Sequence, residues 1–279
     1  MKTFLAVVAD GTAAPVLECA LLAARPFDGC IVGLNALTTE YAVVFGGEMG
    51  FSVSSEVDRT LEREGQERRE QARGVFRAVM QRHGVPIDGA GMGLKAEWRE
   101  EIGRQNAVVG ALGRIFDVIV VERPAKLASL AEATLEDALF ESGRPVLMTP
   151  PVAPSTLGER VLIAWNGSTE TARTVGFARP FLERAKTVQV VSTEGAQAPG
   201  PSGEELAAML RRSGINATAK HIPGRSRAAG EVFLTEARNG GCDLMVKGAY
   251  TQSRLRQMIF GGATRHIIME AEIPVLLAH

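Results

Sequence analysis

The two halves of the sequence carry the same features in the same order, and this repeat constrains the fold more than any other property. Each half opens with an apolar run, a polar turn that contains a glycine and a hydroxyl residue, and a helical pattern. The matching segments are 4–24 and 160–180, 30–37 and 187–194, 117–124 and 243–250, and 143–150 and 272–279. Four landmarks in one order indicate two homologous halves.

Within each half, short apolar runs alternate with helical segments. Residues 161–165 and 243–247 are nearly continuous apolar runs, which are typical of strands buried on both faces of a parallel sheet. Crossovers between parallel strands are right-handed, so this alternation gives an open doubly wound sheet. The sequence therefore predicts an α/β fold with two tandem doubly wound parallel sheets, which is a Rossmann-like arrangement.

A proline-rich segment at residues 149–160 separates the halves and favours an extended linker. We therefore expect one domain at residues 1–150 and a second domain at residues 151–279.

The first half is longer than the second because it contains an insertion around residues 41–83. Residues 54–83 have the charges and the apolar spacing of a long helix. Residues 41–53 are apolar and rich in glycine, which predicts a loop or a lid.

The overall charge argues against a nucleic-acid partner. The net charge is -1, from 31 basic and 32 acidic residues, so no basic excess exists to bind a phosphate backbone. The apolar run near the N-terminus is shorter than the roughly 20 residues of a membrane span. We expect a cytoplasmic protein with no membrane partner. The cysteines are scattered and fit reduced, buried thiols: Cys19, Cys30 and Cys242.

No catalytic constellation is visible in the sequence. It lacks the nucleophile elbow, the Walker A motif and the zinc-protease motif. The neighbouring Glu100 and Glu101 would diverge by about 100° on a helix, and the His266–Glu270 pair lacks a third metal ligand. We therefore predict neither an enzyme nor a metal site, and weak nucleotide hydrolysis is the least supported alternative.

One segment near the C-terminus predicts an anion site. Gly261 and Gly262 precede a helical pattern, and a helix N-terminus offers unpaired N–H groups and a positive dipole end. The Asn166–Ser168 turn and Gly248 follow two predicted strands, at the carboxyl ends where doubly wound sheets bind ligands. The alternative is a tight turn into the helix that binds no ligand.

Three segments of the second half resemble the universal stress protein family in its tandem two-domain form. They read VLIAWNGS at 161–168, KGAYTQSRLRQMIFGGATRHI at 247–267 and IPVLL at 273–277. The resemblance implies five-stranded sheets of the adenine-nucleotide-hydrolase kind, related by a pseudo-twofold axis. It also implies a non-catalytic stress-response module that self-associates. The last strands of the two domains, residues 145–149 and 274–278, would then pair with each other.

The resemblance also implies a ligand, which is ATP or AMP with or without Mg²⁺. ATP-binding members carry the pattern G-x-x-G-x9-G-[ST], which falls here on Gly248, Thr251, Gly261 and Gly262. Thr251 replaces a glycine, and Gly262 replaces a hydroxyl residue. The residues implied to bind the nucleotide are Trp165, Asn166, Thr193, Lys247, Gly248, Thr251, Gly261, Gly262, Ala263 and Thr264. For Lys247, contact with the ligand and extension to the surface both remain open.

The first half departs further from the family pattern. Asp10 keeps the acidic residue that follows the first strand, but residues 122–124 read Glu-Arg-Pro where a glycine is expected. We interpret this half as having lost the nucleotide site. A second hypothesis removes the nucleotide from the whole chain. The protein would then act through protein partners or bind an apolar, lipid-like ligand beneath residues 41–53.

Overall fold

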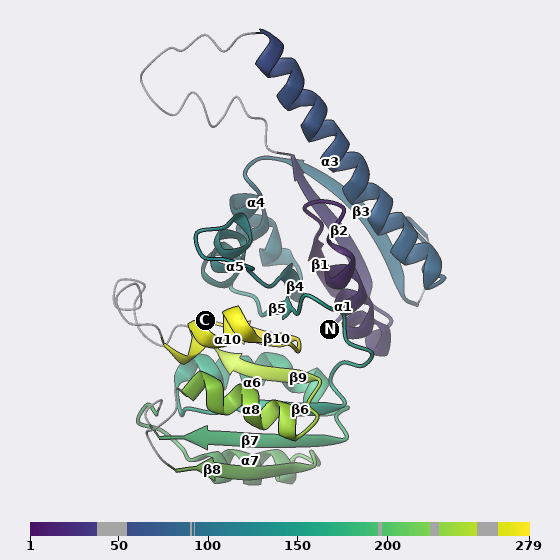
Figure 1. Ribbon diagram of the computed structural model, residues 1–279. Helices are drawn as coiled ribbons and strands as arrows, with labels where there is room; N and C mark the ends of the chain where they lie inside the picture. Colours follow the sequence, from purple (N-terminus) through teal and green to yellow (C-terminus); the bar gives the residue numbers. More distant parts are fainter. Residues whose placement is uncertain (38–54, 90, 92, 195–196, 224–228, 250–261) are drawn as a thin grey trace.

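The computed structural model describes residues 1–37, 55–89, 91, 93–194, 197–223, 229–249 and 262–279 (Figure 1). Its strands form one sheet in the order β3-β2-β1-β4-β5-β10-β9-β6-β7-β8. The strands are β1 (Thr3–Val7), β2 (Cys30–Leu37), β3 (Lys95–Ile102), β4 (Val118–Glu122), β5 (Val146–Thr149), β6 (Arg160–Ala164), β7 (Thr187–Thr193), β8 (Ala217–Ile222), β9 (Leu244–Gly248) and β10 (Val275–Ala278). The predicted α/β fold with parallel, doubly wound strands is confirmed.

The two halves have the same strand order. The first half reads β3-β2-β1-β4-β5 and the second reads β8-β7-β6-β9-β10, with parallel neighbours inside each half. The strand order therefore reverses between β1 and β4 and between β6 and β9. These are the topological switch points where open α/β sheets place their ligands.

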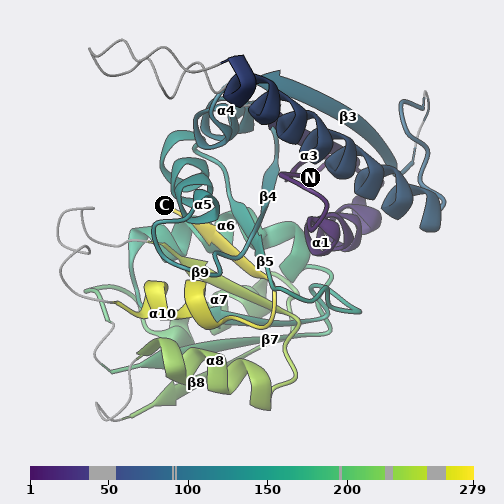
Figure 2. The same cartoon turned by 45° about the horizontal axis from the view of Figure 1, so that its top comes forward.

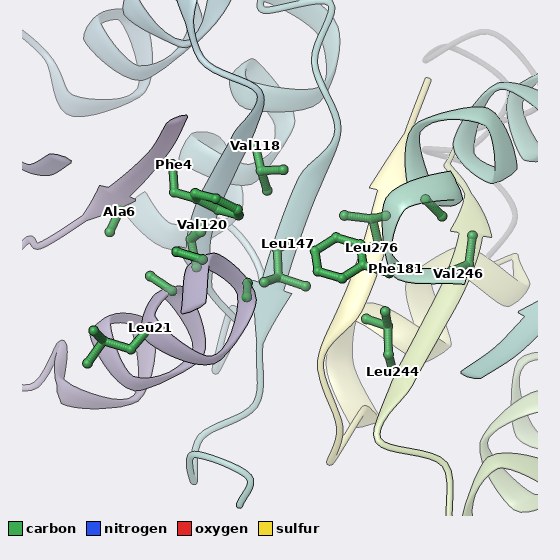
Figure 3. Packing of buried hydrophobic residues seen from close by; sticks show 14 of the residues in the cluster. Phe4, Ala6, Leu21, Val118, Val120, Leu147, Phe181, Leu244, Val246 and Leu276 are labelled. Carbon is green, nitrogen blue, oxygen red and sulfur yellow. The ribbon is translucent and has the colours of Figure 1, made fainter. Parts of the chain in front are cut away.

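The predicted pairing of the two last strands is also observed. Strands β5 and β10 run antiparallel, with Leu147 opposite Leu276 and Met148 opposite Val275. This pairing joins the two five-stranded sheets into one continuous sheet. Figure 3 shows Leu147 and Leu276 meeting within the buried core, beside Phe181.

Helices cover both faces of the sheet, as Figures 1 and 2 show. One buried cluster includes side chains from α1, α3, α6 and α7, and the cluster on the other face includes side chains from α4, α5, α8 and α10. The helices are α1 (Ala14–Ala24), α3 (Ser55–Arg82), α4 (Gln105–Leu112), α5 (Leu130–Glu141), α6 (Thr169–Leu182), α7 (Gly203–Arg212), α8 (Ala229–Asn239) and α10 (Ala263–Glu270), with two short 3-10 helices, η1 (Arg25–Phe27) and η2 (Gly113–Ile115). Each cluster extends across both halves, so the core is shared between them.

The long helix of the insertion is α3, which has 28 residues and matches the predicted range to within one residue at each end. Its apolar side chains Phe76, Val79 and Met80 are fully buried. Phe76 packs so closely on β2 that a Cβ added to Gly33 would lie 2.6 Å from its ring. The predicted loop or lid at residues 41–53 lies outside the described residues. None of the described helices is long and apolar enough to cross a membrane.

Candidate functional site

The turn between β6 and α6 holds its polar groups in a compact network. The side-chain oxygen of Asn166 accepts hydrogen bonds from the backbone N–H of Ser168 at 3.2 Å and from the hydroxyl of Thr171 at 2.6 Å. Ser168 caps α6, because its hydroxyl accepts from the backbone N–H of Thr171 at 3.2 Å. The Asn166 oxygen therefore organises the start of α6.

The loop that follows β7 lies over this turn. The backbone N–H of Ala198 donates to the carbonyl of Asn166 at 2.7 Å, and Trp165 donates from Nε1 to the carbonyl of Pro201 at 2.8 Å. Gly167 has a φ of 79°, and a Cβ added there would lie 2.9 Å from the Ala198 carbonyl. The close approach and the positive φ both require glycine. Trp165 is buried in the core, so it is a packed aromatic residue there.

Gly248, at the end of β9, lies directly against the first turn of α6. A Cβ added to Gly248 would lie 2.4 Å from the backbone nitrogen of Thr171 and 2.7 Å from the carbonyl carbon of Glu170. Backbone atoms cannot move aside as a side chain can, so the packing of α6 on β9 requires glycine. This requirement holds whether or not a ligand is bound.

Lys247 is buried, which excludes the predicted alternative that it extends to the surface. Its Nζ donates to the carbonyl of Gly248 at 2.8 Å and to the hydroxyl of Thr264 at 3.0 Å. Burial disfavours the charged ammonium and lowers the pKa of Lys247 to about 8. Lys247 thereby connects β9 to the first turn of α10.

No side chain of the described residues caps the N-terminus of α10. Gly262 is the N-cap residue, with φ -86° and ψ 173°, and it is exposed. This extended backbone suits any residue, and a Cβ added to Gly262 would meet open space. Thr264 is buried in the same turn. The first N–H groups of a helix have no intrahelical partner, so those of this turn can donate to an external acceptor.

The structure brings most of the predicted site residues to one edge of the sheet. Asn166 contacts Thr171, Thr171 lies against Gly248, and Lys247 contacts both Gly248 and Thr264. Ala263 and Gly262 begin the helix that carries Thr264. Thr193 is buried at the end of β7, the strand beside β6, and its carbonyl accepts from Gln197 at 3.4 Å. Thr251 and Gly261 lie outside the described residues.

Sequence reasoning missed Thr171 and Glu170. The Oε2 atom of Glu170 is buried and has no hydrogen-bond partner among the described residues. Ser168 followed by Thr171 at the start of a helical pattern is an N-cap signal, and it could have directed attention to this turn.

At the equivalent switch point of the first half, a small cavity is lined by apolar side chains together with two acidic ones, Asp10 and Glu122. Asp10 accepts hydrogen bonds from the backbone N–H of Thr12 at 2.7 Å and from its hydroxyl at 2.6 Å. Burial, and then the neighbouring charge of Asp10, raise the pKa of Glu122. Gln105 lines the same cavity and donates to Thr134 at 3.0 Å. Two carboxylates in one cavity disfavour a bound phosphate.

Comparisons with known proteins agree with this architecture. Residues 159–279 match the model of the universal stress protein family. A universal stress protein from Synechocystis, Slr1230, is 24% identical over 169 residues, an alignment that covers 58% of this chain and 57% of that protein. The matched part thus spans little more than half of that relative's length.

Two solved structures share the fold over almost the whole chain. A universal stress protein from Archaeoglobus fulgidus has a TM-score of 0.68 at 14% identity, and the match covers 99% of this chain and 95% of that one. A functionally unknown protein from Pseudomonas aeruginosa has a TM-score of 0.56 at 16% identity, with coverages of 100% and 92%. The second half of the chain, residues 159–279, therefore matches the universal stress protein family directly, and the structural similarities show that the whole chain has the fold of a solved universal stress protein.

Proposed function

We propose that this protein is a non-catalytic stress-response module that binds an adenine nucleotide, ATP or AMP, in its C-terminal half. The nucleotide, with or without Mg²⁺, would place its phosphates on the N-terminus of α10. Its ribose would lie near Asn166 and its base near Thr193. The first half, residues 1–150, would be a partner domain, and nucleotide binding would bias self-association or the binding of a protein partner.

The convergence of donors at one switch point carries this proposal. Lys247, Thr264 and the free N–H groups after Gly262 lie together at the carboxyl end of β9. Each of these groups can donate a hydrogen bond, and the ammonium and the helix dipole both attract negative charge. The equivalent place in the first half holds Asp10 and Glu122 instead, which supports a single nucleotide site in the second half.

Calorimetry with ATP and AMP tests the proposal in wild type and in Gly262→Asp. An aspartate at an N-cap position stabilises a helix, so α10 should remain folded while the new carboxylate repels phosphate. Gly262→Ser is the matched control, since serine caps the helix without adding charge. We expect Gly262→Asp to lose binding and Gly262→Ser to keep it. Wild type that gives neither heat nor a thermal shift at millimolar nucleotide would overturn the proposal.

One observation favours the second hypothesis, a family member that binds no nucleotide. The loop carrying Ala198 closes over Gly167, and the Asn166 oxygen is already used by Ser168 and Thr171. A ribose would find that oxygen occupied. Mass spectrometry of small molecules released from the purified protein separates the two hypotheses, since a released adenine nucleotide supports the first and a released lipid supports the second.

A further inference from the structure

Lys247 is a buried cation for which the described residues provide no anionic partner. The residue is 4% exposed. Both groups that accept its hydrogen bonds, the Gly248 carbonyl and the Thr264 hydroxyl, are neutral. Among the described residues, no carboxylate forms an ion pair with it. A buried charge without a counter-ion is costly, and buried charges are usually paired with an opposite charge.

The sequence that follows Lys247 cannot supply the missing anion. Residues 248–263 contain no aspartate or glutamate, and they include two arginines, Arg254 and Arg256. The part of the sequence between Lys247 and α10 therefore carries positive charge only. A negative charge for Lys247 has to come from another part of the molecule or from a ligand.

The contact with Thr264 shows where such a ligand would sit. An ammonium group can only donate hydrogen bonds, so the Thr264 hydroxyl accepts from Lys247 and directs its own hydrogen elsewhere. Thr264 lies in the first turn of α10, whose N–H groups have no intrahelical partner and can also donate. The turn is thus built of donors around a buried positive charge.

We propose that Lys247 is the specificity-determining residue for the phosphate of the bound nucleotide, and that binding holds a proton on its side chain. This inference rests on the nucleotide function proposed above and adds two features to it. The site should distinguish ATP from adenosine through Lys247. Its affinity should also depend on the protonation of this one lysine.

The proton coupling follows from burial. In the free protein burial lowers the pKa of Lys247 to about 8, whereas a nearby phosphate favours the ammonium form and raises the pKa again. Above pH 8, binding should therefore take up a proton. The surrounding elements carry further charged or titratable groups. They are Glu170, Arg173 and Arg179 on α6, Glu231, Glu236 and Arg238 on α8, Arg265, His266 and Glu270 on α10, and His279 after β10.

The test is calorimetry of ATP and of adenosine at pH 7.5 and pH 9, in pairs of buffers that differ in ionisation enthalpy. We expect wild type to take up nearly one proton per ATP at pH 9, and clearly less at pH 7.5. Adenosine should take up none. Lys247→Met should bind ATP about 10- to 100-fold more weakly at pH 7.5, as expected for the loss of a charge-assisted hydrogen bond, and its adenosine affinity should be unchanged.

Two further variants complete the test. Lys247→Arg keeps the charge but does not titrate in this range, so it should retain ATP affinity and lose the proton uptake. Lys186→Met removes an exposed lysine directly before β7, and it should behave as wild type. If wild type and Lys247→Met bind ATP equally with the same proton uptake, the inference fails while the nucleotide function stands. If wild type binds no nucleotide, both fail.

Discussion

Arg123, directly after β4 in the first half, donates a hydrogen bond from Nη1 to the carbonyl of Met269 in the last turn of α10 in the second half. A guanidinium at a helix C-terminus is favourable, because the free carbonyls there carry partial negative charge. A residue of segment 122–124, which departs from the family pattern in the first half, therefore supports the helix that carries the proposed site in the second half.

Replacing Arg123 should loosen α10. Arg123→Met should lower the free energy of unfolding by about 1–2 kcal/mol, since it removes a charged donor from the helix end. Compared with wild type, the variant should exchange its amide hydrogens faster in α10, and the change in α5 should be smaller. Arg99→Met is the control, because it removes an exposed ion pair with Glu101 that should contribute less than about 1 kcal/mol. Unchanged exchange in α10 would show that Arg123 does not hold it.

Gly248→Ala should destabilise the protein severely. The added Cβ would collide with the backbone of Thr171, so α6 and β9 would have to separate. Overpacking of this kind costs about 1–3 kcal/mol, and immobile backbone atoms favour the upper end. Gly262→Ala is the matched control, since its backbone is extended and its Cβ would meet open space. Urea unfolding should separate the two variants, and equal midpoints would contradict the assigned packing.

Lys247→Met should change the pH dependence of stability. The folded protein holds Lys247 with a pKa of about 8, below its ordinary value of 10.5. Below pH 8 both folded and unfolded chains are protonated, and the full cost of burying the charge is present. Between pH 8 and pH 10.5 the unfolded chain binds more protons, so the stability of wild type rises with pH.

Lys247→Met removes this contribution. The free energy of unfolding of the variant should exceed that of wild type by the largest amount near pH 7. This difference should shrink by at most roughly 3 kcal/mol toward pH 10.5. Thermal unfolding of both proteins across this range provides the measurement. A constant difference between the two proteins would mean that Lys247 keeps an ordinary pKa in the folded state.

Leu276→Ala should weaken both halves together. Leu276 is fully buried opposite Leu147, within a core cluster that extends across the joined sheet. Truncating a buried leucine costs about 2–5 kcal/mol. We expect one unfolding transition, monitored by far-UV circular dichroism, to shift as a whole. Met209→Ala, at a half-exposed residue of α7, is the control and should shift it little. A transition that separates into two would show that the halves unfold independently.

The sequence by itself determined the strands, their parallel arrangement, the common order of elements in the two halves and the long helix α3. Apolar periodicity and repeated order report these features directly, because each depends on residues close together in the chain or on matching segments. It also directed attention to Asn166, Gly248 and Gly262, since turn residues after buried strands are visible as local patterns.

Only the tertiary structure decided what those residues do. Gly248 is required by the backbone of α6, and Lys247 is buried against Thr264, 17 residues further along the chain. Arg123 supports a helix end 146 residues away. Local sequence patterns cannot report such relationships, because contacts between distant residues depend on how the crossover helices pack on the sheet. The burial that lowers the pKa of Lys247 arises from the same packing, and so it too was decided by the tertiary structure.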